Sequence, residues 1–170
     1  MEVRDLYDIN RNMLERKTIK GVKPKKDEYW LVVFIMIENI DGRFLIQKRS
    51  LIKGGKWSIT AGHPKTGEDS YQGLLTEVKE ELGLDINDKK VYVYHTEIDD
   101  YKIVDCYYMK LDINSEELKL QKEEVSDVKL ATFDEIEELI KKEKFLKKHI
   151  RKFYEFKENY LGIKNKYSKL

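Results

Sequence analysis

Three glutamates crowd the end of one predicted helix. Glu77, Glu80 and Glu81 stand at positions i, i+3 and i+4 of the stretch "TEVKEELGL". Helical periodicity places such positions on one face, so the three carboxylates repel one another. Water can offset that repulsion on an exposed face. A divalent cation can do so as well, because Mg²⁺ prefers carboxylate oxygens and commonly binds substrate phosphates at the same time.

The residues around the triplet define the helix that carries it. We expect a helix over residues 69–82, with Asp69 near its start and Gly83 at its C-terminal stop. A second face of this helix is apolar and suits packing on a sheet. The glutamates therefore share a different face from the one that can bury against the sheet.

The spacing of residues 62–84 extends beyond the triplet. Gly62 is followed six positions later by Glu68, and Gly83 and Leu84 close the segment after the glutamates. The segment resembles the Nudix box, G-x5-E-x7-R-E-U-x-E-E-x-G-U, in which U is a bulky aliphatic residue. Both glycines, all four glutamates and both aliphatic residues are in register. One position departs from the pattern, since Thr76 stands where the box has arginine.

The resemblance implies a hydrolase that cleaves the pyrophosphate bond of a nucleoside diphosphate linked to another group. Mg²⁺ is the implied cofactor, with Mn²⁺ as a second choice. The residues that match the metal-binding positions of the box are Gly62, Glu68, Glu77, Glu80 and Glu81. One of the last three could act as the base instead, because crowded carboxylates raise one another's pKa.

Residues outside the box are further candidates for the site. Several Nudix hydrolases add a glutamate from a later loop, which here corresponds to Glu124 or to its neighbour Glu123. Arg49 and Lys53 carry charges that suit phosphates, and His63 follows the first box glycine. Ordinary ion pairs or solvated surface positions are the alternatives for these residues.

Thr76 has a consequence for the box carboxylates. In the family, the arginine at this position pairs with box glutamates and orients them. Threonine carries no charge and does not replace that ion pair. We therefore expect either lower activity or a substitute cation, for which Lys65 is a candidate.

Two other functions compete with the hydrolase. The stretches "DLYDIN", "QKRS" and "AGHP" also resemble isopentenyl diphosphate isomerase, which shares the fold. That enzyme uses a cysteine just before G-H-P, where this chain has Ala61, while Cys106 lies in a predicted strand. The isomerase also binds metal through several histidines, whereas this chain has three that are widely separated. A binding module for a ligand or RNA, with a degraded box, is the other alternative.

The remaining segments predict an α+β fold. "WLVVFIMI" followed by Asp41-Gly42 predicts a buried strand that enters a hairpin. "GGKWSIT" predicts a glycine-rich loop that leads into one short strand. By resemblance, residues 1–140 form a Nudix-type mixed β-sheet sandwiched between helices, with an N-terminal hairpin. Residues 141–170 predict an added basic amphipathic helix that packs on this domain or on a partner subunit, which leaves a homodimer open.

Composition limits the partners of the chain. The 33 basic and 32 acidic residues nearly cancel, which argues against a nucleic-acid partner. The longest apolar run, at residues 29–37, is too short to cross a bilayer, so we expect no membrane partner. With one cysteine and no leader-like segment, we expect a cytoplasmic protein whose partner is a small-molecule diphosphate substrate.

Overall fold

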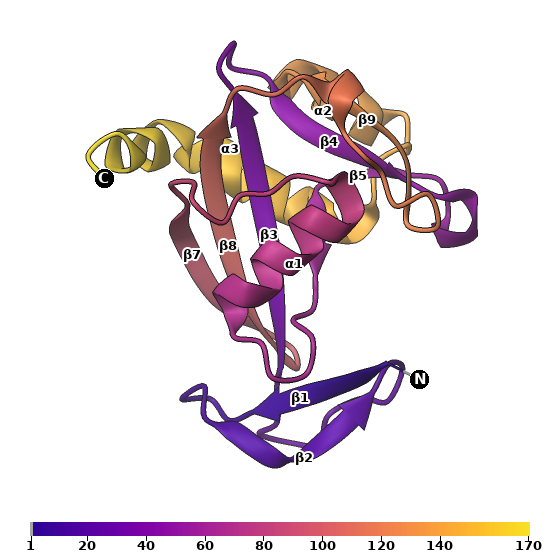
Figure 1. Ribbon diagram of the computed structural model, residues 1–170, viewed down its shortest axis with the longest axis vertical. Coiled ribbons are helices and arrows are strands. Elements are labelled where there is room, and N and C mark those ends of the chain that lie inside the picture. Colours follow the sequence, from indigo (N-terminus) through magenta and orange to yellow (C-terminus); the bar gives the residue numbers. More distant parts are fainter. Residues whose placement is uncertain (1) are drawn as a thin grey trace.

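A seven-stranded mixed sheet forms the centre of the computed structural model, which describes residues 2–170 (Figure 1). The main path of the sheet is β5-β4-β3-β8-β7, while β6 pairs with β3 and β9 pairs with β4. β3 and β8 run parallel, and the other described pairs are antiparallel. The strands are β3 (Trp30–Asn39), β4 (Phe44–Arg49), β5 (Trp57–Ser58), β6 (Thr60–Gly62), β7 (Tyr92–Asp99), β8 (Lys102–Leu111) and β9 (Val125–Ala131).

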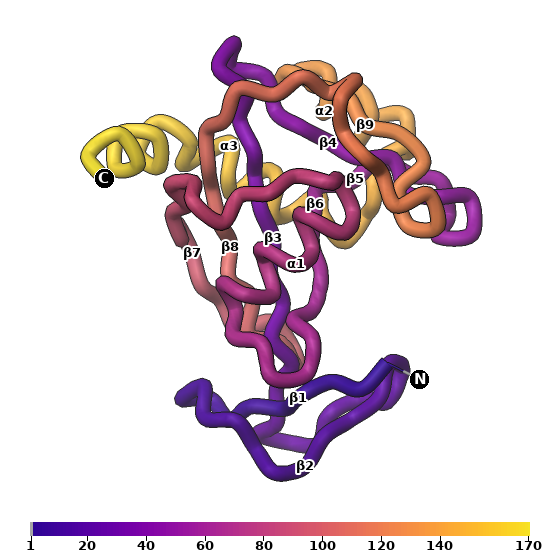
Figure 2. The backbone as a smooth tube through the Cα atoms, in the orientation of Figure 1, coloured from indigo at the N-terminus to yellow at the C-terminus, as the bar shows by residue number. Residues whose placement is uncertain are grey.

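Helices cover both faces of this sheet. α1 (Ser70–Leu82) packs on one face, whereas α2 (Phe133–Lys141) and α3 (Lys147–Tyr167) pack on the other, as the backbone trace also shows (Figure 2). Two short 3₁₀ turns, η1 (Leu51–Lys53) and η2 (Ser115–Glu117), lie in connecting loops. The predicted α+β architecture, with a mixed sheet between helices, is confirmed. Every helix within residues 2–170 is too short or too polar to span a membrane.

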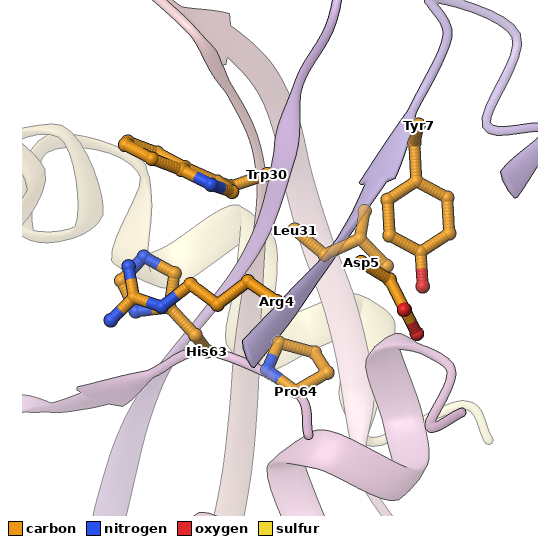
Figure 3. Close-up of a pocket in the computed structure, with 7 residues that line it drawn as sticks. All are labelled: Arg4, Asp5, Tyr7, Trp30, Leu31, His63 and Pro64. Atoms are coloured by element: carbon orange, nitrogen blue, oxygen red, sulfur yellow. The ribbon is translucent and has the colours of Figure 1, made fainter. Parts of the chain in front are cut away.

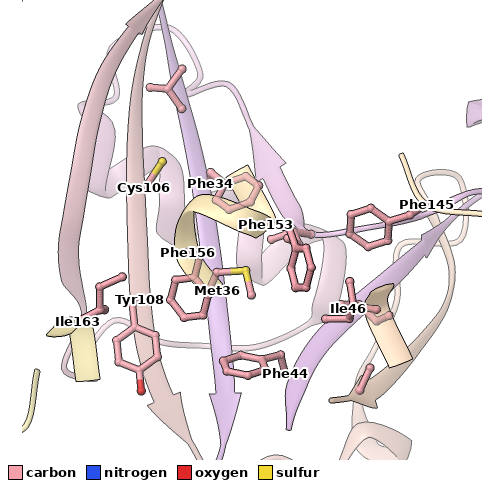
Figure 4. Packing of buried hydrophobic residues seen from close by; sticks show 14 residues of the cluster. Phe34, Met36, Phe44, Ile46, Cys106, Tyr108, Phe145, Phe153, Phe156 and Ile163 are labelled. Carbon is pink, nitrogen blue, oxygen red and sulfur yellow. The ribbon is translucent and has the colours of Figure 1, made fainter. Parts of the chain in front are cut away.

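The continuous apolar sequence of β3 follows from its position between the two layers of helices. Its odd-numbered residues from Val33 to Ile37 face α1, where they meet Leu74 and Val78. Its even-numbered residues Phe34 and Met36 belong to the cluster on the other face (Figure 4). The aromatic side chains of α3 that complete this second cluster are Phe153 and Phe156. Both faces of the strand are therefore buried, as the sequence predicts.

The N-terminal hairpin stands apart from the main sheet. β1 (Val3–Tyr7) and β2 (Met13–Ile19) pair around a turn in which the Asp8 carboxylate accepts hydrogen bonds from the Asn10 and Asn12 backbones. Arg11 in this turn donates two hydrogen bonds, of 2.9 and 2.5 Å, to Asp105 on β8. The hairpin is thereby fastened to the sheet beside the start of α1.

Two local features differ from the prediction. The sequence indicates one short strand after the glycine-rich loop, but the structure has two, β5 and β6, which pair with different neighbours, β4 and β3. The C-terminal helix begins at Lys147, because Trp57 exchanges backbone hydrogen bonds with Lys144 and Leu146 just before it.

Candidate active site

Both ends of α1 are fixed by specific contacts. The Asp69 side chain accepts a hydrogen bond from the backbone N–H of Gln72, and the Gln72 side chain accepts one from Asp69 in return. At the other end Gly83 has φ of 69°, and a Cβ there would lie 2.7 Å from the Lys119 side chain. The helix is thus set firmly in the loop-helix-loop that carries the glutamates.

Glu77 lies directly against the backbone of β6. A Cβ added to Gly62 would come within 2.1 to 2.4 Å of the Glu77 carboxyl group, so only glycine permits this approach. The backbone N–H of His63 donates a hydrogen bond of 3.2 Å to Glu77. Burial raises the pKa of Glu77 to about 8, and the negative charges of Glu81 and Glu80 act in the same direction.

Glu81 is held from β4. The Gln47 amide donates a 2.7 Å hydrogen bond to Glu81, and its carbonyl oxygen accepts one of 2.7 Å from the Thr60 hydroxyl. Burial raises the pKa of Glu81, which the Gln47 hydrogen bond partly opposes. Gln47 and Thr60 are both buried, and sequence reasoning overlooked both. The only sequence signal was a polar residue in each of two apolar strands, "FLIQKR" and "SIT".

Thr76 and Lys65 contact the other two box glutamates. The Thr76 hydroxyl donates a 2.6 Å hydrogen bond to one oxygen of Glu68. The other oxygen of Glu68 accepts a 2.8 Å hydrogen bond from the backbone N–H of Lys65. The Lys65 ammonium forms an ion pair with Glu80, the most exposed of the helix glutamates. Lys65 thus occupies the place expected of a substitute cation.

The structure brings Glu124 to the site and leaves Glu123 in solvent. Glu124 pairs with Lys53 at 2.9 Å, and its charge acts to raise the pKa of Glu81. The Ser50 backbone N–H donates to the Glu124 carbonyl at 2.8 Å, which ties the two loops together. The Arg49 Nε donates to the Lys53 carbonyl oxygen at 3.0 Å, and its charge acts on Glu81 in the opposite direction.

The His63 imidazole lies apart from the glutamates. Burial lowers its pKa to about 3, with the Arg4 charge acting in the same direction. The ring meets Trp30 edge-on at 6.2 Å between centroids, in a small cavity of about 10 Å³ (Figure 3). His63 therefore meets the box through its backbone, and its side chain forms a wall between β6 and the N-terminal hairpin.

Comparison with known proteins agrees with this geometry. The family described as NUDIX domain matches residues 28–154. The chain belongs to the Nudix hydrolase family. An uncharacterised Nudix hydrolase of Listeria innocua is 38% identical over 148 residues, which cover 82% of this chain and 85% of the relative.

Solved structures show the same fold. DR0079 of Deinococcus radiodurans has a TM-score of 0.69 at 16% identity, covering 85% of this chain and 91% of that one. A C. elegans Ap4A hydrolase has a TM-score of 0.58 at 19% identity, covering 77% and 98%. At these identities the similarity establishes the architecture of this Nudix protein and leaves its substrate open.

The box carboxylates suit a hard divalent cation by their chemistry. Glu77 and Glu81 are largely buried, offer oxygen donors and repel each other, which a cation between them relieves. Their side chains are not drawn together as a preformed cage, because Glu80 turns to Lys65 and Glu68 to Thr76. Glu80 and Glu68 therefore already have protein partners in this arrangement.

Within residues 2–170, one group of three ligand atoms lies within 4.8 Å of one another, at His95, Glu97 and Glu155. Arg151 already pairs with both of these glutamates, and Lys152 pairs with Glu97. We interpret this group as an ion-pair cluster that fastens α3 to β7.

The features specific to the isomerase do not gather in this Nudix protein. Ala61 and Cys106 flank Phe34 from opposite sides in the sheet. The thiol is buried, which raises its pKa to about 11. Nor do the histidines converge, since His95 is exposed on β7 and His149 accepts a hydrogen bond from Ile59 in the core.

Proposed function

We propose that this Nudix hydrolase is Mg²⁺-dependent and cleaves the pyrophosphate bond of a nucleoside diphosphate linked to another group. One observation carries the proposal: Glu77 is buried against the glycine backbone of β6 beside the second buried carboxylate, Glu81. Two unneutralised buried carboxylates are costly. A cation bound between the two carboxylates offsets this cost, and the same cation can bind the diphosphate of a substrate.

Each residue of the site has a proposed task. Glu77, Glu80 and Glu81 hold the metal, with Glu68 and the Gly62 backbone beside it. When bound, Mg²⁺ supplies neutralisation of the phosphate charge and activation of water. Arg49 and Lys53 orient phosphate oxygens. Glu124 is the proposed proton acceptor from outside the box, which is supported by its pairing with Lys53 and by the effect of its charge on Glu81.

The setting of the reaction is also part of the proposal. A single buried cysteine suits a reducing compartment, and we propose that the protein acts on a small-molecule diphosphate in the cytoplasm. Residues 1–140 are the proposed catalytic domain, and residues 141–170 add a helix that packs on the same chain. We propose a possible homodimer as well, and light scattering of the purified protein measures whether the protein is a monomer or a dimer.

A turnover screen tests the function. The substrates are ADP-ribose, dinucleoside polyphosphates, NADH, nucleoside triphosphates and isopentenyl diphosphate, each with Mg²⁺, Mn²⁺ or EDTA. We expect phosphoanhydride cleavage with the metals and none with EDTA. Isomerisation of isopentenyl diphosphate, or inactivity on every compound with both metals, contradicts the proposal.

Matched variants connect turnover to the box. Glu80→Gln/Glu81→Gln is expected to lower kcat/KM by at least about 100-fold, because the charge that holds the metal is lost. Glu138→Gln/Glu158→Gln removes the same charge from exposed helix positions and serves as the control. Mn²⁺ titration of both variants adds a measurement that is independent of the substrate. Equal Mn²⁺ affinity in the two variants would contradict the assignment of metal binding to Glu80 and Glu81.

A further inference from the structure

Basic side chains from four separate elements meet beside the box. Arg4 comes from β1, Arg49 from the end of β4, Lys102 from the start of β8 and Lys148 from the first turn of α3. Burial lowers the pKa of Lys148, and the charges of Arg49, Lys102 and Arg4 act on it in the same direction. We call these four residues the basic cluster.

The backbone joins two of these residues independently: Leu146, just before α3, donates a hydrogen bond to Trp57, which is the ladder partner of Lys48 on β4. The start of α3, with Lys148, therefore lies beside the end of β4 that carries Arg49.

Trp30 lies next to two members of the basic cluster. Lys102 is paired with Trp30 in the parallel β3–β8 ladder. The Arg4 guanidinium lies 5.6 Å from the centroid of the Trp30 ring and next to the His63 imidazole (Figure 3). The Trp30 indole N–H is buried and has no hydrogen-bond partner among residues 2–170. Trp30 thus forms an aromatic wall beside Arg4 and Lys102, whereas Lys148 is exposed to solvent.

The cluster is largely unneutralised. Arg4 pairs with Glu2 at 3.0 Å. Among the ion pairs of the described residues 2–170, none involves Arg49, Lys102 or Lys148. Within the part of the chain that the structure describes, the Arg49 side chain donates through its Nε alone, to the Lys53 carbonyl, so both terminal nitrogens remain for a ligand. Four adjacent cations with one carboxylate partner repel one another unless an anion joins them.

The N-terminus of α3 adds to the same field. Its first turn contains no acidic residue and has no side-chain cap, and it carries Lys148 at the positive end of a 21-residue helix. A lysine is unfavourable at that end because the helix dipole repels it. Free backbone N–H groups at such an end favour phosphate. The repulsion among the cations and the positive end of α3 favour the same kind of ligand, an anion.

Arg49 connects the cluster to the proposed metal site. Its charge acts on Glu81 on one side and on Lys148 and His149 on the other. On β4, Arg49 lies only two positions after Gln47, which donates a hydrogen bond to Glu81. A ligand held at the glutamates can therefore extend past Arg49 toward Lys148. A chain of linked phosphates carries enough negative charge to bind both at the proposed metal site and at the basic cluster.

We propose that Arg4, Arg49, Lys102 and Lys148 form a second anion subsite, which binds a substrate phosphate beyond the diphosphate held at the box. The inference rests on the proposed function and narrows its substrate class. Compounds with three or more linked phosphates are favoured over those in which the diphosphate joins two uncharged groups. An additional phosphate replaces the missing carboxylate partners of the cluster.

Binding of inorganic tripolyphosphate tests the subsite without catalysis. The full chain is titrated calorimetrically in EDTA, so that only contacts between protein and anion contribute. Lys102→Gln/Lys148→Gln is expected to weaken binding by roughly tenfold or more, because two charges of the cluster are lost. Lys166→Gln/Lys169→Gln removes two exposed charges at the far end of the chain and should bind as the parent does. Unchanged binding in the first variant, or equal loss in both, overturns the inference.

Kinetics supply the second readout. With a polyphosphate substrate, Lys102→Gln/Lys148→Gln should raise KM several-fold and leave kcat nearly unchanged, while the far-end variant changes neither. If the parent is active but Lys102→Gln/Lys148→Gln binds tripolyphosphate as the parent does, the subsite is refuted and the proposed function stands. If the parent is inactive on every substrate but the double variant loses tripolyphosphate binding, the proposed function is refuted and the subsite stands.

Discussion

The Thr76 hydroxyl donates a 2.6 Å hydrogen bond to Glu68, eight residues earlier in the box. The residue that replaces the family's arginine therefore still orients a box carboxylate. The charge that threonine lacks is supplied by Lys65, which pairs with Glu80. Orientation and charge compensation, which one arginine can provide together, are divided here between two residues.

Thr76→Val keeps the shape of the side chain and removes its hydroxyl. We expect the free energy of unfolding to fall by about 1 to 2 kcal/mol, because Glu68 loses a charge-assisted hydrogen bond at a half-buried position. Mn²⁺ affinity should fall as well, by several-fold, since Glu68 is then free to rotate. Thr76→Ser retains the hydroxyl and should resemble the parent in both urea denaturation and Mn²⁺ titration. Equal metal affinity in Val and Ser variants would contradict a role for this contact.

Gly62→Ala places a methyl group where the Glu77 carboxyl lies. The clash, at 2.1 to 2.4 Å, must move Glu77 or β6. A displacement of about 1 Å at such a site is expected to lower kcat/KM on the order of 100-fold. Gly162→Ala is the matched control, because a Cβ there meets nothing within 4 Å and α3 gains helix propensity. The control should be as active as the parent and more stable by about 0.5 to 1 kcal/mol. Full activity of Gly62→Ala would show that the Glu77 position is not critical.

Local sequence signals located most of the fold and the box. Asp69 and Gly83 marked the ends of α1 because capping depends on residues close in the chain. The apolar run at residues 30–37 and the Asp41-Gly42 turn located β3 and its hairpin for the same reason. Glu77, Glu80 and Glu81 share one face because helical periodicity is also local.

Contacts between distant segments were not predicted. Gln47 reaches Glu81 across 34 positions, and its role follows from pairing β4 beside β6 and α1, which no local pattern encodes. The basic cluster joins four elements in the same way. The break between β5 and β6 was missed because it depends on which neighbour each strand pairs with. Residue types therefore indicated the chemistry, while the tertiary fold decided the partners.

Arg11→Met tests how the hairpin holds the start of α1. Asp105 is buried, and it accepts hydrogen bonds from Arg11, Ser70 and Thr96. Burial acts to raise the pKa of Asp105, but these hydrogen bonds hold it below its usual value. Without Arg11 a buried carboxylate loses its cation, so urea denaturation should show a loss of about 3 kcal/mol.

Arg16→Met provides the comparison within the same hairpin. Arg16 pairs with Glu28, a carboxylate whose side chain is 14% exposed against 5% for Asp105, while the two arginines are similarly exposed. Because Glu28 is less deeply buried than Asp105, the Arg16–Glu28 pair is expected to contribute less to stability than the Arg11–Asp105 pair. A loss for Arg11→Met no larger than that for Arg16→Met would contradict a fastening role for Asp105.

Comparing the parent with Glu97→Gln should reveal how the Glu97 carboxylate makes stability depend on pH. Hydrogen bonds from Arg151 lower the pKa of Glu97 to about 2 from its usual 4.5, with burial opposing and Lys152 assisting. A carboxylate whose pKa is depressed by folding stabilises the native state fully above the unfolded pKa, and this contribution disappears as pH falls through the folded value. The difference in unfolding free energy between parent and Glu97→Gln should thus be constant from pH 7 to about 5 and shrink between 4.5 and about 2. Glu158→Gln, on the exposed side of α3, should show little difference at any pH. Denaturation curves at pH 7, 5, 4 and 3 decide the matter, and a difference that persists undiminished at pH 3 would contradict the assignment of the shift to the Arg151 pair.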